Sequence, residues 1–131
     1  MLLDTSTLVE IFRNLSESAV VENITTKMED EDAYISMIQV GEIADWAARN
    51  ETPLEERIEA VKELARIVPL SERICLDAAE IKRERRTAGY KSFGLIDGII
   101  LATARSIGQR VLTFDRDFKG EKDCILLSLG S

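Results

Sequence analysis

Residues 92–118 constrain the fold more than any other stretch, because they combine a helix, a turn, a strand and acids in one short run. Apolar residues cover most faces of a helix drawn over residues 95–107, which predicts a buried helix with Ser92 as its N-cap. Gly108 is expected to end this helix as a C′ glycine. The apolar residues 111–114 then predict a short buried strand.

Two acids in this stretch stand at positions that need a chemical explanation. Asp97 lies beside Leu101 and Ala104 on the buried helix. A carboxylate among core residues is costly unless a metal ion or hydrogen-bond donors compensate it. Asp115 directly follows the strand. Ligands of open α/β sheets bind outside the carboxyl ends of the strands, so Asp115 is a candidate site residue.

The composition limits the class of protein. A chain of 131 residues with 45% apolar side chains fits one domain with a real core, which we expect to span residues 1–131. No apolar run approaches the ~20 residues of a membrane span, and no basic region precedes an apolar segment at the start. We therefore expect neither a membrane anchor nor a signal peptide. Cys75 and Cys124 are too few for a disulfide framework, which indicates the reducing cytoplasm.

The charged residues narrow the function. The net charge of −7 argues against a protein that coats nucleic acid through a broad basic surface. It does not exclude a nuclease, because an acidic metal site also lowers the net charge. The chain has no histidine, which excludes every mechanism that needs a histidine base or ligand. A metal ion would be held by oxygen atoms, which favours Mg²⁺ or Mn²⁺ over Zn²⁺.

Strands and helices alternate along the chain. Capping boxes at Ser36/Gln39 and at residues 52–55, the second with Pro53 at its first helical position, predict two helix starts, and Ser71 predicts a third. This alternation predicts an α/β fold with three layers, α/β/α, around a central, mainly parallel sheet of about five short strands. The expected strands are residues 1–3, 34–35, 67–68, 111–114 and 124–129, and the expected helices are residues 8–12, 16–27, 36–49, 52–66, 71–88 and 92–107.

Asp4 and Glu42 have simple structural interpretations when the pattern alone is considered. Asp4 follows the first strand, so right-handed crossovers would bring it to the same sheet edge as Asp115. Considered alone, Asp4 is better explained as a cap of the next helix. Glu42 lies in line with Ile38 and Trp46 but off the core face of its helix, which is typical of an exposed glutamate.

Four segments give the chain a resemblance to PIN-domain nucleases of the small prokaryotic VapC-type toxin group. They are Leu3-Asp4-Thr5-Ser6, Gly41-Glu42-Ile43, the run from Leu95 to Ala104 and the run from Leu112 to Phe118. The last two segments together are fairly specific, and the resemblance extends over nearly the whole chain. One departure is Gly98, where the family often has alanine, and we expect no cost from it.

This resemblance implies a metal-dependent ribonuclease with a PIN-like fold. It replaces the pattern-based interpretations of Asp4 and Glu42. By position it assigns the catalytic, metal-binding acids to Asp4, Glu42, Asp97 and Asp115, with Asp117 as a less constant further ligand. It also matches Thr5, Ser6 and Thr113 to polar residues that support the ligands. Two Mg²⁺ or Mn²⁺ ions held there would activate water and stabilise the leaving oxygen of an RNA phosphodiester.

The resemblance also implies partners. We expect an RNA substrate, with Arg85, Arg86 and Lys91 as candidate contacts to its backbone. A toxin would have an antitoxin protein, and the gene for it would lie beside this one. We also expect a homodimer, because the family generally pairs and because Ile38 and Trp46 would form an apolar strip too large for a monomer to expose.

Single positions in the sequence argue against two other functions. A dehalogenase-type phosphatase needs a second acid two positions after its aspartate, where this chain has Ser6. A receiver domain needs an aspartate after its third strand, and residues 68–70 supply none. Two alternatives stay open: a PIN-fold RNA-processing nuclease without an antitoxin, and a non-catalytic RNA-binding or assembly module. The complete acidic set argues against the second of them.

Overall fold

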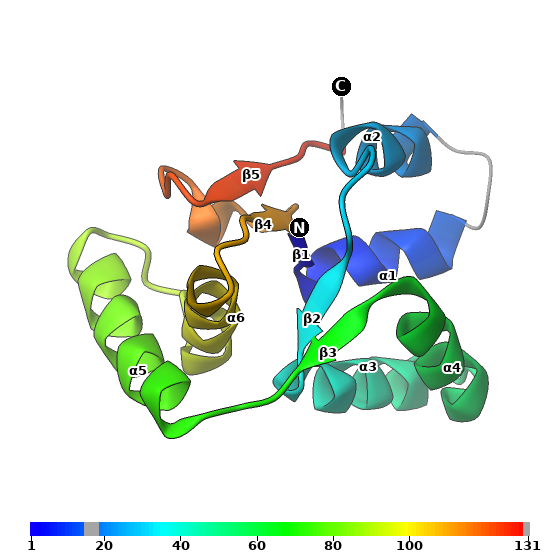
Figure 1. The fold of residues 1–131 in the computed structure, drawn as a ribbon, viewed down its shortest axis with the longest axis horizontal. Helices are drawn as coiled ribbons and strands as arrows, with labels where there is room; N and C mark the ends of the chain where they lie inside the picture. The colour runs from blue at the N-terminus through cyan, green and yellow to red at the C-terminus, as the bar shows by residue number, and fades with distance from the viewer. Residues whose placement is uncertain (15–18, 130–131) are drawn as a thin grey trace.

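Five parallel strands form a sheet between two layers of helices, as the sequence predicts (Figure 1). The structure is a computed structural model that describes residues 1–14 and 19–129. Its strands are β1 (Leu2–Leu3), β2 (Tyr34–Ser36), β3 (Arg66–Val68), β4 (Val111–Thr113) and β5 (Cys124–Leu126). Its helices are α1 (Thr5–Asn14), α2 (Ala19–Lys27), α3 (Ile38–Arg49), α4 (Leu54–Leu64), α5 (Glu72–Thr87) and α6 (Leu95–Ser106), with the 3₁₀ helix η1 (Arg116–Phe118) before β5.

The order of the strands determines where a site can form. Across the sheet the strands lie in the order β3-β2-β1-β4-β5, and every neighbouring pair is parallel. Leu2 in the central strand is in register with Tyr34 of β2 on one side and with Val111 of β4 on the other. The chain winds from β1 to β3 and then returns to the other side of β1 with β4. In such sheets, ligands bind beyond the strand ends at the point where the winding reverses.

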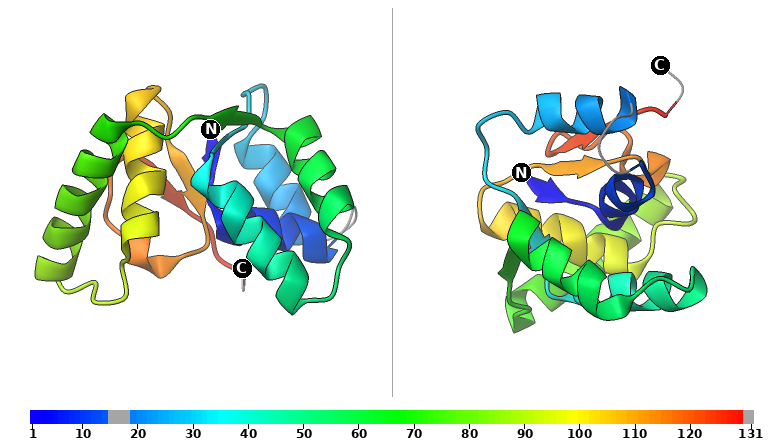
Figure 2. Two further views of the ribbon diagram at one scale, coloured as in Figure 1. Left: turned by 90° about the horizontal axis from the view of Figure 1, so that it is seen from below. Right: turned by 90° about the vertical axis from the view of Figure 1, so that its right-hand side faces the viewer.

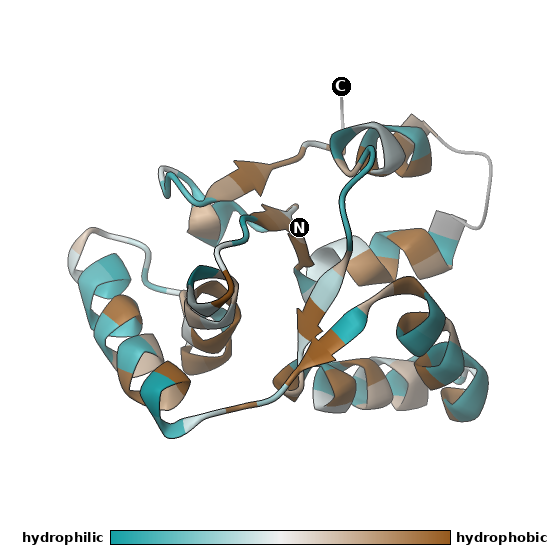
Figure 3. Ribbon diagram, in the orientation of Figure 1, coloured by the Kyte–Doolittle hydropathy of each residue, from teal (hydrophilic) through white to brown (hydrophobic). Residues whose placement is uncertain are grey.

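Each face of the sheet has its own hydrophobic core, because side chains alternate along a strand. Leu2 belongs to the core formed with α5 and α6, whereas Leu3 belongs to the core formed with α1, α2, α3 and α4. Figure 2 shows these two helical layers on opposite sides of the strands, and Figure 3 shows the hydrophobic strands in brown between them. The three-layer prediction is therefore confirmed.

Helices α5 and α6 pack unusually closely, and Gly98 makes this approach possible. A Cβ atom built on Gly98 would lie 2.5 Å from the carbonyl oxygen of Ala78, well inside van der Waals contact. An alanine at this position would force the two helices apart. The glycine at position 98 therefore has a structural reason, which the sequence pattern did not reveal.

Several helix starts differ from the sequence prediction. Helix α1 begins at Thr5 rather than at Leu8, and α3 begins at Ile38 rather than at Ser36. Gly94, and not Ser92, is the N-cap of α6, and the carboxylate of Asp97 accepts a hydrogen bond from its backbone N–H at 2.7 Å. Pro53 is the N-cap of α4 rather than its first residue. The prediction for α5 is confirmed, because the side chain of Ser71 caps its first turn.

Other boundaries agree more closely. Gly108 has a φ of +65° just after α6, as predicted for the residue that ends this helix. The side chain of Gln39 accepts a hydrogen bond from the N–H of Ser36 at 2.8 Å, which is one half of the predicted capping box. The predicted helix over residues 16–27 begins outside the described residues, and α2 is described from Ala19. The last strand, β5, is shorter than predicted.

The surface differs from the prediction at Trp46 and Ile38. Trp46 is only 8% exposed, because its ring packs against that of Phe12 with the ring centroids 5.7 Å apart. Ile38 is partly buried as well, so the predicted exposed strip of Ile38 and Trp46 is wrong.

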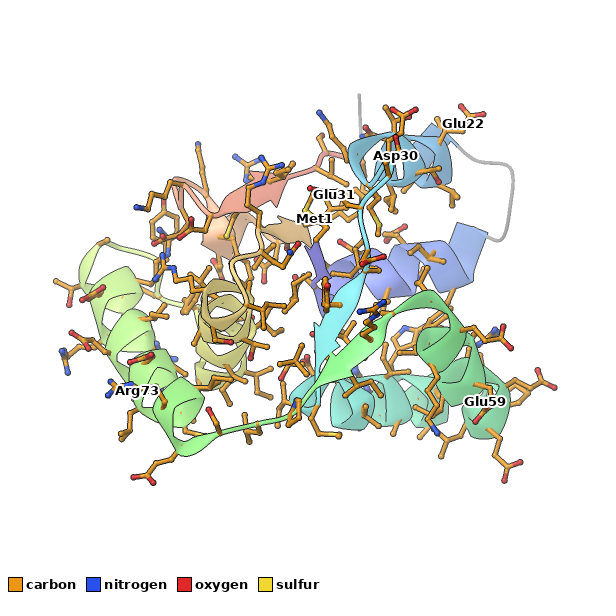
Figure 4. All side chains as sticks on the ribbon, viewed as in Figure 1. Met1, Glu22, Asp30, Glu31, Glu59 and Arg73 are labelled. Atoms are coloured by element: carbon orange, nitrogen blue, oxygen red, sulfur yellow. The ribbon has the colours of Figure 1, made fainter. Side chains whose placement is uncertain are left out.

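Charged side chains lie on the outer faces of several helices. Figure 4 shows the side chains of Glu22, Glu59 and Arg73 extending outward from α2, α4 and α5. None of the described helices is long and apolar enough to cross a membrane.

Candidate metal centre

Three carboxylates meet beyond the strand ends. Asp97 lies in the first turn of α6, Asp115 follows β4, and Asp117 belongs to η1. One oxygen atom from each lies within 4.8 Å of the other two. Mg²⁺ binds oxygen atoms at about 2.1 Å, so ligands on opposite sides of the ion lie about 4.2 Å apart. The spacing of the three acids is therefore close to that of a shared cation site.

A local hydrogen bond holds each of these carboxylates. Asp115 Oδ1 accepts from the backbone N–H of Asp117 at 2.9 Å, and this bond caps η1. Asp117 Oδ2 accepts from the hydroxyl of Ser92 at 2.7 Å. Asp97 Oδ2 accepts from the N–H of Gly94, as described above. The fold itself thus orients all three acids. The sequence pattern predicted Ser92 as a helix cap, so its hydrogen bond to Asp117 was not expected.

Asp4 is the most buried acid of the site, with 4% of its surface exposed. Thr113 donates to Asp4 Oδ2 at 2.6 Å, and Ser6 donates to the same oxygen at 2.9 Å. Backbone amides orient both hydroxyls, because the N–H of Asp115 donates to Thr113 at 2.9 Å and the N–H of Phe114 donates to Ser6 at 3.0 Å. A hydroxyl oxygen that accepts an N–H bond directs its own hydrogen elsewhere, here to the carboxylate.

Glu42 enters the site from α3. The hydroxyl of Thr5 donates to Glu42 Oε1 at 2.6 Å. The Thr5 oxygen accepts in turn from the side-chain amide of Gln39 at 3.3 Å, and the same amide donates to the carbonyl of Leu3 at 2.7 Å. Hydrogen bonds therefore connect the end of β1 to Glu42. The sequence predicted Gln39 only as half of a capping box, since no local signal reveals a contact to β1.

Burial and mutual repulsion oppose the ionisation of these acids. The pKa of Asp97 is raised from 3.8 to about 6, mainly by burial and further by the charges of Asp4, Asp115 and Glu42. The hydrogen bond from Gly94 acts in the opposite direction. Burial also raises the pKa of Asp4 and of Glu42, against the hydrogen bonds that each accepts. The four predicted acids therefore share one electrostatic environment.

The described residues supply no ion-pair partner to this cluster. None of their lysine or arginine side chains forms an ion pair with Asp4, Glu42, Asp97, Asp115 or Asp117. Like charges at close range are unfavourable, and a divalent cation relieves the repulsion. Because all donors are carboxylate oxygens, the residues fit Mg²⁺ or Mn²⁺.

The three basic residues predicted to contact RNA have different surroundings. Arg85 is only 7% exposed, and its guanidinium donates to the backbone carbonyl of Lys119 at 2.8 Å and to that of Asp117. Arg85 is therefore not accessible to a phosphate, and this part of the prediction is wrong. Arg86 donates to a backbone carbonyl at 2.8 Å but is exposed, and Lys91 is also exposed.

A groove of about 610 Å³ opens beside the site. Its lining includes the polar residues Thr5, Ser6 and Glu42, together with apolar side chains such as Ile38 and Ile96. The volume lies within the range of ligand-binding clefts. Among the acids of the site Glu42 lines this hollow, and Ile96 and Phe114, the sequence neighbours of Asp97 and Asp115, line it as well.

The fold and the acids define an α/β protein with a carboxylate-lined centre at the reversal point of a parallel sheet. The family model of the PIN domain matches residues 1–120. The chain therefore belongs to the PIN-domain family.

Solved structures share this fold, and one of them is described as a toxin-antitoxin complex. A toxin-antitoxin complex from Klebsiella pneumoniae has a TM-score of 0.74 and 22% identity, over 95% of this chain and 94% of that chain. FitAcB from Neisseria gonorrhoeae has a TM-score of 0.68 and 32% identity, over 88% of each chain. VapBC2 from Rickettsia felis, bound to a promoter DNA fragment, has a TM-score of 0.72 and 18% identity, over 97% and 96%. No match was found among curated proteins.

Proposed function

We propose that this protein is a metal-dependent endoribonuclease that hydrolyses RNA phosphodiester bonds with Mg²⁺ or Mn²⁺. The observation that carries the proposal is the convergence of the acids on one sheet edge, with no ion-pair partner among the described residues. Clustered carboxylates suit divalent cations and phosphodiester chemistry, and Glu42 of this set lines an open groove. Membership of the PIN-domain family supports the same activity.

The residues of the site have different proposed roles. Asp97, Asp115 and Asp117 would hold a cation, and Asp4 and Glu42 add negative charge beside it. Bound there, Mg²⁺ or Mn²⁺ would supply activated water and stabilise the leaving oxygen of the phosphodiester, the chemistry of two-metal sites. The hydroxyl groups around Asp4 and Glu42 keep these carboxylates oriented.

Two exposed basic residues are proposed to hold the RNA. Arg86 and Lys91 lie at the end of α5 and in the segment that leads from it to Ser92, whose hydroxyl reaches Asp117. Phosphate contacts of this kind carry no sequence information, but they make binding depend on salt.

The protein is further proposed to be the toxin of a toxin–antitoxin pair, with a small antitoxin protein as its partner. The support is that solved structures of the same fold include a toxin–antitoxin complex. An antitoxin gene next to this one would agree with this role, whereas its absence would favour an RNA-processing nuclease. The cytoplasm is the proposed location, because Cys75 and Cys124 are both free thiols.

A homodimer remains part of the proposal, on different grounds. Trp46 is buried, but Met37, Leu95 and Ile96 have 47%, 46% and 39% of their surfaces exposed. These residues stand at the N-terminal ends of α3 and α6, where a second copy of the chain would cover them.

The test is the cleavage of a structured RNA with an exposed loop. Wild type, Asp115→Asn and Glu59→Gln are compared, because Glu59 is an exposed acid on α4 and serves as the matched control (Figure 4). Wild type and control should cut only with added Mn²⁺ or Mg²⁺ and should leave 5′-phosphate ends. Asp115→Asn should be slower by about 100-fold or more. Cleavage in chelator would exclude the metal mechanism, and metal binding without cleavage would favour the non-catalytic module.

A further inference from the structure

Arg85 is a buried cation whose contacts lead directly to the candidate metal centre. We propose that it is a positioning residue for this centre. Its guanidinium fixes the segment of residues 115–121 and thereby the positions of Asp115 and Asp117. This inference rests on the proposed metal function, and it concerns a residue that ligates no metal itself.

The guanidinium holds the main chain of that segment at two points. Nη2 of Arg85 donates to the carbonyl oxygens of Asp117 and Lys119, the latter at 2.8 Å. Nη1 donates to Glu121 Oε1 at 3.3 Å, and this carboxylate balances the buried charge. One side chain of α5 thus holds three residues that lie 32 to 36 positions further along the chain.

Aromatic rings hold the guanidinium in turn. Cζ of Arg85 lies 3.7 Å from the ring centroid of Tyr90 and 5.7 Å from that of Phe93. Phe93 packs edge-on against Phe118 of η1, with the centroids 5.3 Å apart. The planar guanidinium lies on the ring of Tyr90 while its two terminal nitrogens reach acceptors of three residues. Lysine has no planar group to stack and only one nitrogen to serve these acceptors, so the site favours arginine.

The same region also holds the side chain of Asp117. Ser92, two residues after Tyr90, donates its hydroxyl to Asp117 Oδ2 at 2.7 Å. The N–H of Asp117 donates to the carboxylate of Asp115 at 2.9 Å. A shift of the main chain at Asp117 would therefore move two of the three clustered acids.

The segment needs such external support. A 3₁₀ helix of three residues, such as η1, is marginal by itself. Burying a charge is costly, and the cost is offset only when the charge is well hydrogen-bonded. Fixing this short segment is the physical role that the contacts of Arg85 provide.

Two substitutions separate the contacts of Arg85 from its charge. Arg85→Lys keeps the charge and loses the fork of donors, whereas Arg85→Met removes both. Arg105→Lys is the matched control, because Arg105 bonds the same Glu121, at 2.8 Å, and its remaining bond, at 2.9 Å, is to Asp123. The control therefore disturbs the shared carboxylate without touching the carbonyls of residues 117 and 119.

The experiment measures Mn²⁺ affinity by titration calorimetry and the hydrogen exchange of the amides of residues 115–121 in metal-free protein. Both Arg85 variants should bind Mn²⁺ about 10- to 100-fold more weakly than wild type. Their amides in this segment should exchange faster, while those of α6 should not. Arg105→Lys should stay close to wild type in both measurements.

The outcomes distinguish three situations. Unchanged Mn²⁺ affinity in Arg85→Lys, even with a lower Tm, would mean that Arg85 stabilises the fold without positioning the acids, and the proposal would be overturned. Absence of Mn²⁺ binding by wild type would contradict the proposed function itself, and this inference with it. If neither Arg85 variant folds, Tyr90→Leu removes the ring beside the guanidinium instead. Weaker Mn²⁺ binding in that variant supports the positioning role, and unchanged binding overturns it.

Discussion

Neutralising Asp97 tests the metal centre through stability rather than activity. Asp97→Asn keeps the shape of the side chain and removes one charge from the crowded acids. Asparagine can still accept the hydrogen bond that Gly94 donates to Asp97 at 2.7 Å, so the first turn of α6 keeps this bond. We therefore expect the variant to be more stable than wild type at neutral pH in the presence of a chelator.

The size of this gain follows from the pKa of Asp97. A rise from 3.8 to about 6 corresponds to about 3 kcal/mol of unfavourable free energy for the ionised form. Because Asp97 is partly exposed, screening by solvent reduces this value to roughly 1–2 kcal/mol. The weaker hydrogen bond from Gly94 to a neutral acceptor costs about 0.5 kcal/mol. The net gain of about 1 kcal/mol should raise Tm by about 3–5 °C.

The pH dependence of the stability difference between wild type and Asp97→Asn shows whether the ionisation of Asp97 causes it. The folded protein holds the Asp97 proton more tightly than the unfolded chain, so ionisation destabilises the folded state as the pH rises from about 4 to about 6. Below this window Asp97 is protonated in both states, and the two proteins should melt almost alike. Above this pH window, Asp97→Asn should show its full gain in stability over wild type.

Metal should reverse the order of stability. Mn²⁺ at about 100 times its Kd stabilises a binding protein by about 2.7 kcal/mol. Asp97→Asn has lost one ligand of the cluster formed with Asp115 and Asp117, so it should gain much less. Wild type should therefore melt at the higher temperature when Mn²⁺ is saturating.

Circular dichroism melts across this pH window, with chelator and with Mn²⁺, make the comparison. Asp97→Ala is the matched control, because it removes both the charge and the oxygen that accepts from Gly94, and it should be less stable than Asp97→Asn. A clear loss of stability for Asp97→Asn in chelator, together with indifference to Mn²⁺, would refute the reasoning. Asp97 would then serve only the first turn of α6.

Three further predictions concern packing, hydrogen bonding and assembly. Gly98→Ala should lower stability by about 1–3 kcal/mol with or without Mn²⁺, because its Cβ would meet the carbonyl of Ala78, and an unchanged Tm would show that α5 moves away freely. Thr113→Val removes a hydrogen bond to the buried carboxyl group of Asp4, so denaturant unfolding at pH 7 should show a loss of about 1.5–3 kcal/mol, and an unchanged stability would contradict this. Light scattering at micromolar concentration should give the mass of a dimer, and a monomer mass would exclude the proposed pairing.

The features that the sequence predicts correctly have local signals. Ser71 caps α5 because a hydroxyl at that position satisfies the first free amides of the helix. Gly108 ends α6 because it adopts a positive φ. Asp4 and Asp115 follow neighbouring parallel strands, so their approach needs only the strand positions and the handedness of the crossovers.

The features that the sequence does not predict arise from contacts between distant residues. Arg85 resembles any basic residue near the end of a helix, and only the fold brings Tyr90 beside it and the carbonyl of Lys119 within reach. Gly98 has no turn to explain it, and its reason is the crossing of α5 over α6. Trp46 lies off the apolar face that the helical pattern suggests, yet Phe12 covers its ring.

The placement of charge around the acids has a consequence for their function. An arginine paired directly with the carboxylate of Asp117 would occupy the oxygen atoms that a cation requires. Arg85 donates instead to the main-chain carbonyls of Asp117 and Lys119, and Glu121 balances its charge. In the proposed role, Arg85 therefore positions the acids through the main chain and forms no salt bridge with them. The acids have no ion-pair partner in the described chain, so their oxygen atoms are available to the metal ion that we propose.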